Sequence, residues 1–229
     1  DFSSRRFKDP AVINSIHTTD IVPVDLNCLL YHLEQTIAGT YQLMFQPLLA
    51  RRFRQRAEKR AAAISRYMWD EKEQFFVDYD FRAGERTGRI TLAGVYPLYT
   101  KIATPDQAKA VANRIEKDFL KPGGLVTTLL ETGQQWDAPN GWAPLQWITI
   151  LGLREYGYNA LAEKIKRRWM KTCEDVYAQE GKMVEKYNVI EPNKRGAGGE
   201  YTLQDGFGWT NAIYVALIEE DEKTRTARS

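Results

Sequence analysis

The sequence predicts an all-α protein, and three observations support that prediction. Apolar residues recur at the spacing of amphipathic helices along most of the 229 residues. Segments that favour strands are short and few. The unusual polar and aromatic residues are confined to alternate loops between the predicted helices. This pattern is typical of helix pairs packed in layers, in which each pair needs its neighbours to cover its apolar face.

The predicted helices follow one another along the chain with short connections. The first carries Leu26, Leu29, Leu30, Leu33 and Ile37 on one face. The second carries a basic run at residues 51–60, which we interpret as a solvated helix face. The fourth is ended by the proline and glycines at 122–124, which do not continue a helix. The predicted helical ranges are 25–44, 47–67, 91–101, 105–120, 142–156, 159–178 and 208–219.

Three segments are predicted to be non-helical. Residues 69–81 are predicted to form a turn with a short, extended, β-like arm. Residues 192–199 are rich in glycine and charge and are predicted to form a loop. The tail at 220–229 is polar and is expected to be frayed.

Composition argues against several classes of function. The formal net charge is +2, so there is no electrostatic case for binding nucleic acid or an anionic membrane. No stretch approaches the roughly 18 apolar residues of a membrane span. Cys28 and Cys173 lack metal-ligand spacing, and His17 and His32 lie outside any ligand cluster, so no metal site is predicted. The glycine run at 196–199 lacks the lysine and hydroxyl of a phosphate-binding loop.

The segment at residues 134–147, QQWDAPNGWAPLQW, combines tryptophans and amides with a single carboxylate. A protein core would exclude the polar groups, and a solvated turn would not use tryptophan. A sugar site needs both kinds of side chain, because rings stack on the pyranose while polar groups bind its hydroxyls. Carboxylates among tryptophans also suit cleavage of a glycosidic bond, in which one acid protonates the leaving oxygen and a second carboxylate completes the reaction.

Two stretches, QQWDAPNGWAPLQW and QDGFGWTN (204–211), resemble the most characteristic motifs of the trehalases, inverting hydrolases of α,α-trehalose. The resemblance implies that residues 1–229 form the C-terminal portion of a single (α/α)6 toroidal catalytic domain whose N-terminal portion is absent. It spans nearly the whole chain, since further motifs match in the same order: DFSSR (1–5), IVPVDLN (21–27), PGGL (122–125), VEKYN (184–188) and the glycine run followed by Glu200-Tyr201.

The resemblance also implies roles for individual residues. Asp1 falls on the general acid of the family and Glu185 on its general base. Glu200 matches a carboxylate that binds substrate hydroxyls. The substrate-clamping arginines of the family lie upstream, so an upstream part of the same protein is expected to complete the site. The predicted substrate-binding residues are Gln134, Trp136, Asp137, Trp142, Glu200, Phe207 and Trp209.

Some of these assignments have a structural alternative. Asp137 could instead cap the helix that begins near Trp142, and the tryptophans could simply be core. Two positions depart from the family pattern. Arg6 stands where the family usually has tryptophan, and Ala197 interrupts a shortened glycine run. Neither departure removes an acid or a base.

The sequence therefore predicts a glycoside hydrolase that converts the disaccharide α,α-trehalose into two glucose molecules without a cofactor. Asp1 would protonate the bridging oxygen, and Glu185 would activate the attacking water. The alternatives are a non-catalytic sugar-binding protein of the same fold and a helical-toroid sugar epimerase, which the scarcity of histidine disfavours. Few cysteines and no visible export feature favour the cytoplasm, with the periplasm as the alternative. Without the upstream arginines, the chain alone could be inactive.

Overall fold

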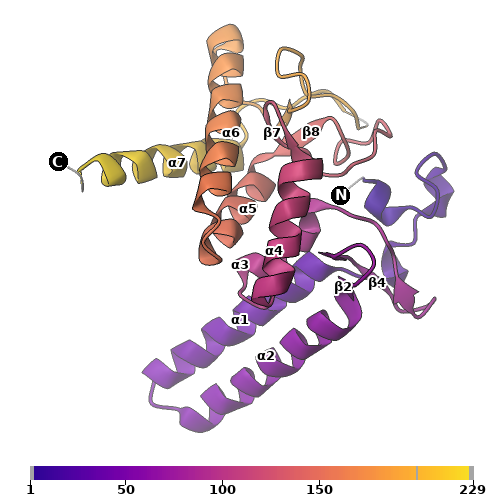
Figure 1. Ribbon diagram of the computed structural model, residues 1–229, viewed down its shortest axis with the longest axis vertical. Coiled ribbons are helices and arrows are strands. Elements are labelled where there is room, and N and C mark those ends of the chain that lie inside the picture. Colours follow the sequence, from indigo (N-terminus) through magenta and orange to yellow (C-terminus); the bar gives the residue numbers. More distant parts are fainter. Residues whose placement is uncertain (1–2, 200, 227–229) are drawn as a thin grey trace.

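The computed structural model describes residues 3–199 and 201–226, and most of these residues are helical (Figure 1). Each helical segment predicted from the sequence contains a helix, so the all-α prediction is confirmed. Within two of these segments, Leu92–Val95 forms a 3-10 helix and Ile115–Phe119 forms a π-helix. The α-helices are α1 (Val24–Leu43), α2 (Pro47–Met68), α3 (Tyr96–Tyr99), α4 (Pro105–Arg114), α5 (Ala143–Glu155), α6 (Asn159–Glu180) and α7 (Gly208–Thr226).

Local chemistry accounts for where several helices begin and end. Thr104 and Gln107 form a reciprocal capping box at the start of α4, and Pro105 occupies its first turn. Gly181 ends α6 in the left-handed conformation, at φ 71°, which glycine adopts without steric cost.

The strands are two or three residues long and form antiparallel pairs. The arm predicted at 69–81 is confirmed: β2 (Trp69–Asp70) pairs with β3 (Phe75–Phe76), and β4 (Tyr79–Asp80) pairs with β1 and β5. The sequence analysis did not anticipate the pairing of β8 with β9, which joins distant parts of the chain. The remaining bounds are β1 (Ile21–Val22), β5 (Glu85–Arg86), β6 (Leu120–Lys121), β7 (Gly124–Leu125), β8 (Asn140–Trp142) and β9 (Lys186–Asn188).

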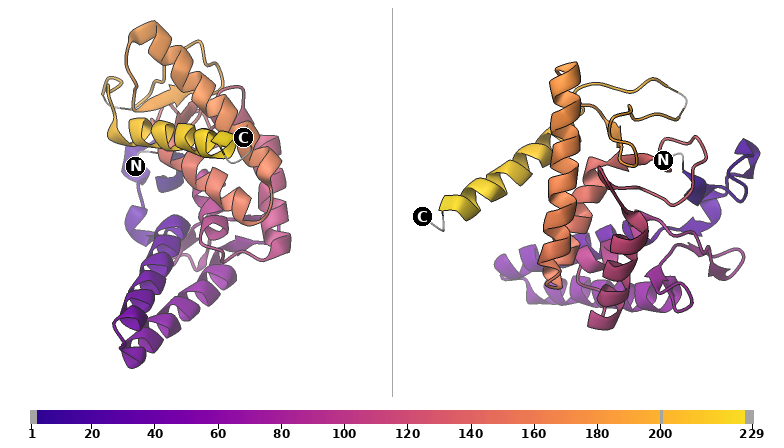
Figure 2. Two further views of the ribbon diagram at one scale, coloured as in Figure 1. Left: turned by 90° about the vertical axis from the view of Figure 1, so that its left-hand side faces the viewer. Right: turned by 45° about the horizontal axis from the view of Figure 1, so that its top comes forward.

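Helix α5 forms the centre of the core, where α3, α6 and α7 pack against it (Figures 1 and 2). Its polar Gln146 is fully buried, and its amide bonds both the N–H and the carbonyl of Leu125. This reciprocal pairing satisfies a polar side chain that would otherwise be costly to bury. The core thereby fixes β7 against the helix that follows the tryptophan-rich segment.

Helices α1 and α2 form an antiparallel pair that projects from the other helices (Figures 1 and 2). The predicted apolar stripe of α1 is only partly buried. Leu26, Leu29 and Leu33 are 50%, 44% and 51% exposed, while Val24 and Cys28 are buried. Leu30 and Ile37 of the stripe are half-buried, and α1 packs against α2 and α3.

The tail predicted to be frayed, 220–229, begins inside α7, which continues through Thr226, and its last three residues lie outside the described part of the chain. Ion pairs fasten this part of α7 to earlier helices. Arg154 of α5 lies 2.9 Å from Glu220, and Lys166 of α6 lies 2.6 Å from Asp221. Of the helices within residues 3–199 and 201–226, none is both long and apolar enough to cross a membrane.

Candidate active site

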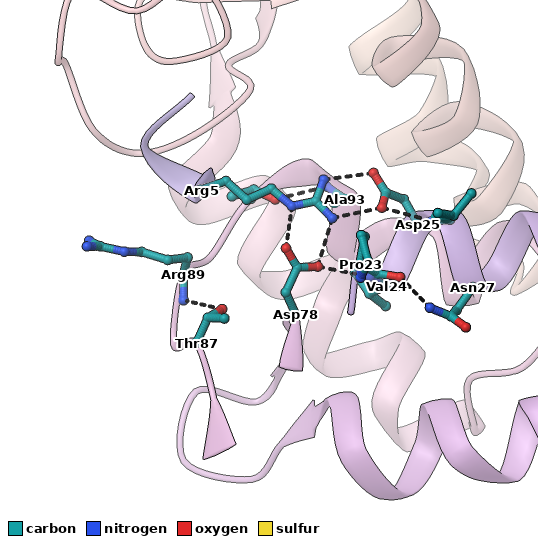
Figure 3. Close-up of polar contacts among 11 residues, drawn as sticks. Arg5, Pro23, Val24, Asp25, Asn27, Asp78, Thr87, Arg89 and Ala93 are labelled. Atoms are coloured by element: carbon teal, nitrogen blue, oxygen red, sulfur yellow. Dashed lines mark hydrogen bonds and ion pairs between the residues drawn. The ribbon is translucent and has the colours of Figure 1, made fainter. Parts of the chain in front are cut away.

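The described N-terminal segment is held by a buried arginine. Arg5 lies in a single 3-10 turn, Ser4–Arg6, and its guanidinium donates two hydrogen bonds to each of two carboxylates (Figure 3). The bonds to Asp25 are both 2.7 Å, and those to Asp78 are 2.5 and 2.7 Å. This planar, bidentate arrangement suits arginine and not lysine. The turn is thereby tied to the start of α1 and to the β-arm.

Burial and neighbouring charges shift the pKa values of Arg5 and Asp25 in opposite directions. Burial lowers the pKa of Arg5, but the carboxylates of Asp78 and Asp25 raise it by more, so the net pKa lies above the ordinary arginine value. Burial raises the pKa of Asp25, yet the hydrogen bonds and charge of Arg5 bring it below its usual value. Arg5 and Asp25 therefore both stay charged at neutral pH.

Asp137, in the middle of the tryptophan-rich segment, is completely buried. One of its carboxylate oxygens accepts from the Ser4 hydroxyl at 2.8 Å and from the Thr128 hydroxyl at 2.7 Å. The other accepts from the Ser4 N–H at 2.8 Å and from the hydroxyl of Thr132. Asp137 does not cap α5, because the N-cap residue is Trp142 and no side chain bonds the first turn. The carboxylate is bonded to loop residues on two segments of the chain.

The tryptophans of the two characteristic motifs form one aromatic cluster. Trp136 and Trp142 stack with their centroids 3.9 Å apart and their planes 4° from parallel. Trp209 meets both edge-on, at 6.2 and 5.8 Å, and Phe207 lies 4.9 Å from Trp209. Trp142 is buried and its ring nitrogen donates to the Gln135 carbonyl, whereas Trp209 is 36% exposed. The cluster therefore has a core side and an open side.

A cavity of about 250 Å³ lies on the open side of this cluster. Trp136 and Trp209 line it, together with Ser3, Arg5 and Asp25. Indole rings beside charged and hydroxyl groups are the combination that recognises a sugar ring and its hydroxyls. Its other lining residues are Thr91, Ala93, Tyr96, Thr127, Thr128, Pro144 and Leu145.

Tyr96 supplies a hydrogen-bonding hydroxyl in this cavity. Burial, aided by the nearby charge of Asp25, raises the pKa of Tyr96 to about 12. The phenol is therefore protonated at neutral pH and can both donate and accept a hydrogen bond.

The β8–β9 ladder brings Glu185 next to the aromatic cluster. Trp142 in β8 opposes Lys186 in β9, so Glu185 directly precedes the residue paired with the tryptophan. Glycine at position 141 lets this ladder pack closely against β7, since the first carbon of a side chain there would lie 2.7 Å from the Leu125 carbonyl oxygen. Two sequence motifs that are far apart in the chain thus share one small sheet.

Glu185 is fully buried and paired with its own neighbour. One carboxylate oxygen lies 2.6 Å from the Lys186 ammonium, and the other accepts from the Tyr201 hydroxyl at 3.4 Å. Lys186 also donates to the Gln135 side chain at 3.2 Å and lies over the rings of Trp142 and Tyr201. The ammonium is surrounded by a carboxylate, an amide and two π faces, which together compensate its burial.

The predicted site residues fall into four groups. Trp136 and Trp209 line the cavity, and Phe207 and Trp142 belong to the aromatic cluster without lining it. Gln134 is partly exposed, and Asp137 and Glu185 are buried outside the cavity lining. Asp1 and Glu200 lie outside the described residues, so their predicted roles have no structural test.

Sequence reasoning missed four charged residues that build the site. Arg5 and Asp25 stand in the motifs DFSSR and IVPVDLN without a predicted role, and Asp78 is predicted only as part of the extended arm. Nothing in the sequence distinguishes Lys186 from a solvent-exposed lysine. A usable signal existed for the acids, because Asp25 and Asp78 are each flanked on both sides by apolar or aromatic residues. An acid in such surroundings is rarely buried without a cation.

A metal centre is not formed by the part of the chain that the structure describes. No group of three or more histidine, cysteine, aspartate or glutamate side chains there is arranged to hold an ion. The site chemistry available from the described residues is hydrogen bonding, aromatic stacking and carboxylate proton transfer.

Comparisons with known proteins place these observations in a family. The sequence model of the family Trehalase matches residues 1–221. The periplasmic trehalase of Pseudomonas aeruginosa is 46% identical over 218 residues, which cover 95% of this chain and 40% of that protein. The chain thus spans about two-fifths of the length of this curated relative.

Two solved structures resemble the fold. The neutral trehalase from Saccharomyces cerevisiae superposes with a TM-score of 0.74 at 28% identity, over 87% of this chain and 38% of that chain. A GH63 mannosylglycerate hydrolase from Thermus thermophilus, solved with glucose, gives a TM-score of 0.68 at 24% identity, over 86% and 47% of the two chains. The likeness confirms the predicted fold class, a part of an (α/α)6 toroid with short strands.

Proposed function

The chain belongs to the trehalase family, and from this we propose that the protein hydrolyses α,α-trehalose to two glucose molecules with inversion at the anomeric carbon. One structural observation carries the proposal most directly. The cavity between Trp136 and Trp209 is lined by Ser3 and Arg5, which closely follow Asp1 in the chain. Under the proposal, the acid carried by this segment protonates the glycosidic oxygen of a sugar bound in the cavity.

In the proposed mechanism, Asp1 is the general acid and Glu185 the general base. Asp1 protonates the bridging oxygen, while Glu185 takes a proton from the water that attacks the opposite face of the anomeric carbon. An inverting pair needs about 6.5–9.5 Å between its carboxyl groups to admit this water. An acid that must be protonated at neutral pH needs a raised pKa, and a dry aromatic pocket disfavours its charged form. No cofactor enters the reaction.

Water and the sugar can reach the carboxylate of Glu185 only if the residues packed over it move. Glu185 is fully buried, its carboxylate accepts from Tyr201, and its N–H donates to the carbonyl of Gln204. Under the proposal, Tyr201 and Gln204 move so that water and the sugar can approach Glu185. Gly198 and Gly199, which precede them in the chain, have φ values of 88° and 87°, a conformation that is strained for residues with a side chain.

We further propose that this chain forms the C-terminal portion of the catalytic domain, and that an upstream part of the same protein completes the site. The curated relative is more than twice as long as the chain, which spans 40% of it. The exposed leucines of α1 present an apolar face that further helices of a toroid would bury. The disaccharide is the proposed partner, with Gln134, Glu200 and Phe207 as further sugar contacts.

For the compartment, the relatives support the periplasm over the cytoplasm. The Pseudomonas aeruginosa relative is named a periplasmic trehalase. On the basis of that name, the periplasm is the proposed compartment.

The decisive experiment measures the products of trehalose hydrolysis by the protein and its carboxylate variants. Inversion releases one α- and one β-glucose from α,α-trehalose, and NMR of the fresh products distinguishes them from the two α-glucoses of a retaining enzyme. Glu185→Gln and Asp1→Asn should each lower kcat by about 10²–10⁴-fold, the usual contribution of a general acid or base.

The matched control is Glu191→Gln, which changes an exposed glutamate paired with Lys194 in the loop that follows β9. It should leave the rate within about twofold of the wild type, because exposed ion pairs contribute little. Normal turnover by Glu185→Gln would remove that residue from the mechanism. Binding of trehalose without glucose release by the wild type would instead support a non-catalytic sugar-binding protein.

A further inference from the structure

The carboxylate of Asp137 has no capacity left for a sugar. An ionised carboxylate offers about four lone-pair directions, two on each oxygen. Here each oxygen accepts two protein hydrogen bonds, from Ser4 twice and from the hydroxyls of Thr128 and Thr132. The side chain is also completely buried, so no face of it is open to the cavity. A sugar hydroxyl could bond this carboxylate only by displacing one of these donors.

The donors come from two segments that are far apart in the sequence. Thr128 and Thr132 lie in the loop that leads into the tryptophan-rich motif, a few residues from Asp137. Ser4 lies 133 positions away, at the start of the 3-10 turn that follows Asp1 in the chain. The backbone N–H at the start of such a turn has no partner within it, and Asp137 supplies the acceptor. The carboxylate therefore joins the N-terminal segment to the tryptophan loop.

A second anchor acts on the next residue from another direction. The Arg5 guanidinium is clamped by Asp25 and Asp78, on the start of α1 and on the β-arm. Ser4 and Arg5 are thus both immobilised by buried charge-assisted hydrogen bonds, which are roughly twice as strong as neutral ones. Three peptide bonds separate Ser4 from Asp1. The segment is therefore fixed at two successive residues that lie close in sequence to the proposed acid.

We propose that Asp137 is a positioning residue, which aligns the general acid Asp1 with the bridging oxygen by holding Ser4, and that it makes no contact with the sugar. This inference rests on the proposed function. Proton donation in the transition state requires the acid to lie within hydrogen-bonding distance of the leaving oxygen. A misplacement of about 1 Å in such a group costs on the order of 10²-fold in rate.

The test is Asp137→Asn, assayed on two substrates that differ in their need for an acid. Asparagine keeps the shape but offers one acceptor oxygen, so the amide nitrogen faces two donors and the Ser4 contacts are weakened. On trehalose, kcat should fall about 10–100-fold with KM changed less than about threefold. On α-glucosyl fluoride, whose leaving group needs little protonation, the loss should be less than about threefold, as for Asp1→Asn.

The same two-substrate comparison separates the competing explanations. A sugar contact would raise KM for both substrates, and a merely structural role would lower both kcat values equally; either result overturns the inference. Asp175→Asn is the control, since it removes an exposed carboxylate of α6 that pairs with Lys171 at the surface, and both rates should be unchanged.

A milder variant keeps the inference testable if Asp137→Asn does not fold. Ser4→Ala removes one of the four hydrogen bonds and leaves the backbone bond in place. It should show the same selectivity for trehalose with a smaller loss, and an equal loss on both substrates would count against the inference. Failure of the wild type to release glucose from trehalose would refute the proposed function. The positioning role alone would be refuted if the wild type is active and Asp1→Asn loses activity mainly on trehalose, while Asp137→Asn loses activity equally on trehalose and on α-glucosyl fluoride.

Discussion

Replacing Arg5 by methionine should destabilise the protein strongly. The change removes all four guanidinium hydrogen bonds, so Asp25 and Asp78 lose the cation that bonds them directly and keep only the nearby charge of Arg6. Asp78, whose side chain is 3% exposed, then keeps one backbone donor, the Val24 N–H at 2.9 Å. Asp25 keeps the Leu26 N–H at 2.8 Å, but its side chain is 24% exposed and can gain water. Most of the cost therefore comes from Asp78.

The size of the effect follows from these two environments. Four hydrogen bonds to charged groups, at about 1.5–3 kcal/mol each, set an upper limit of roughly 6–12 kcal/mol. Hydration of Asp25 and relaxation around Asp78 reduce this loss, and broken buried ion pairs typically cost about 3–5 kcal/mol. For a chain of this length, that corresponds to a fall in Tm of roughly 6–20 °C.

Denaturant unfolding at pH 7, followed by circular dichroism, measures the change in the free energy of unfolding. Arg167→Met is the matched control, because Arg167 is 79% exposed and pairs with Glu163 within α6. It should cost no more than about 0.5 kcal/mol. Adding Asp78→Asn to Arg5→Met should recover at least about 1 kcal/mol, since the double variant no longer buries that unpaired charge. A cost for Arg5→Met as small as that of the control would refute this account of the cluster.

Two further predictions concern acid and the aromatic cluster. Because the folded-state pKa of Asp25 is depressed, its contribution is present above the unfolded pKa of about 3.9 and is lost as the pH falls through the folded pKa. The stability difference between wild type and Asp25→Asn, measured by urea unfolding at pH 7 and below pH 4, should shrink at the lower pH; a constant difference would contradict it. Trp142→Ala should lower the unfolding free energy by about 3–5 kcal/mol, while Trp209→Ala should cost less and raise the KM for trehalose more. Thermal unfolding measures the first effect and trehalose kinetics the second. If Trp209→Ala destabilised the protein more and Trp142→Ala raised the KM more, the core and open sides of the cluster would be misassigned.

The helices were predictable from sequence because their signals are local. Apolar periodicity, Pro105 after Thr104 and Gly181 after α6 each act within a few residues of the element they define. The buried face of α1 was not predictable from the same pattern. Four leucines and an isoleucine mark an apolar stripe, but Cys28 and Val24 are buried more completely, and three of the leucines are exposed.

The candidate site likewise has features that local sequence predicts and features that depend on contacts between distant residues. Its aromatic residues could be named from sequence because tryptophan beside amides is unusual in itself. The role of Asp137 could not, because three of its four donors are hydroxyls and none is distinctive in the sequence. Two of those four bonds come from Ser4, 133 residues away, a distance that no local pattern reports. Likewise, Lys186 is an unremarkable neighbour of Glu185 until β9 places it against Trp142.

The tryptophan loop bonds Ser4, close in sequence to the proposed acid, and Lys186, which is paired with the proposed base. On one side, Asp137 holds Ser4, next to the segment that carries Asp1. On the other, the Gln135 side chain accepts from Lys186, which is paired with Glu185. These two contacts arise only two residues apart on one loop, and the stacked rings of Trp136 and Trp142 stiffen it. Inversion requires the two carboxyl groups to keep a separation that admits one water. Under the proposed mechanism, a single short, stacked segment bonded to both neighbourhoods would keep that separation constant, and this would account for the combination of tryptophan with buried polar groups in the motif.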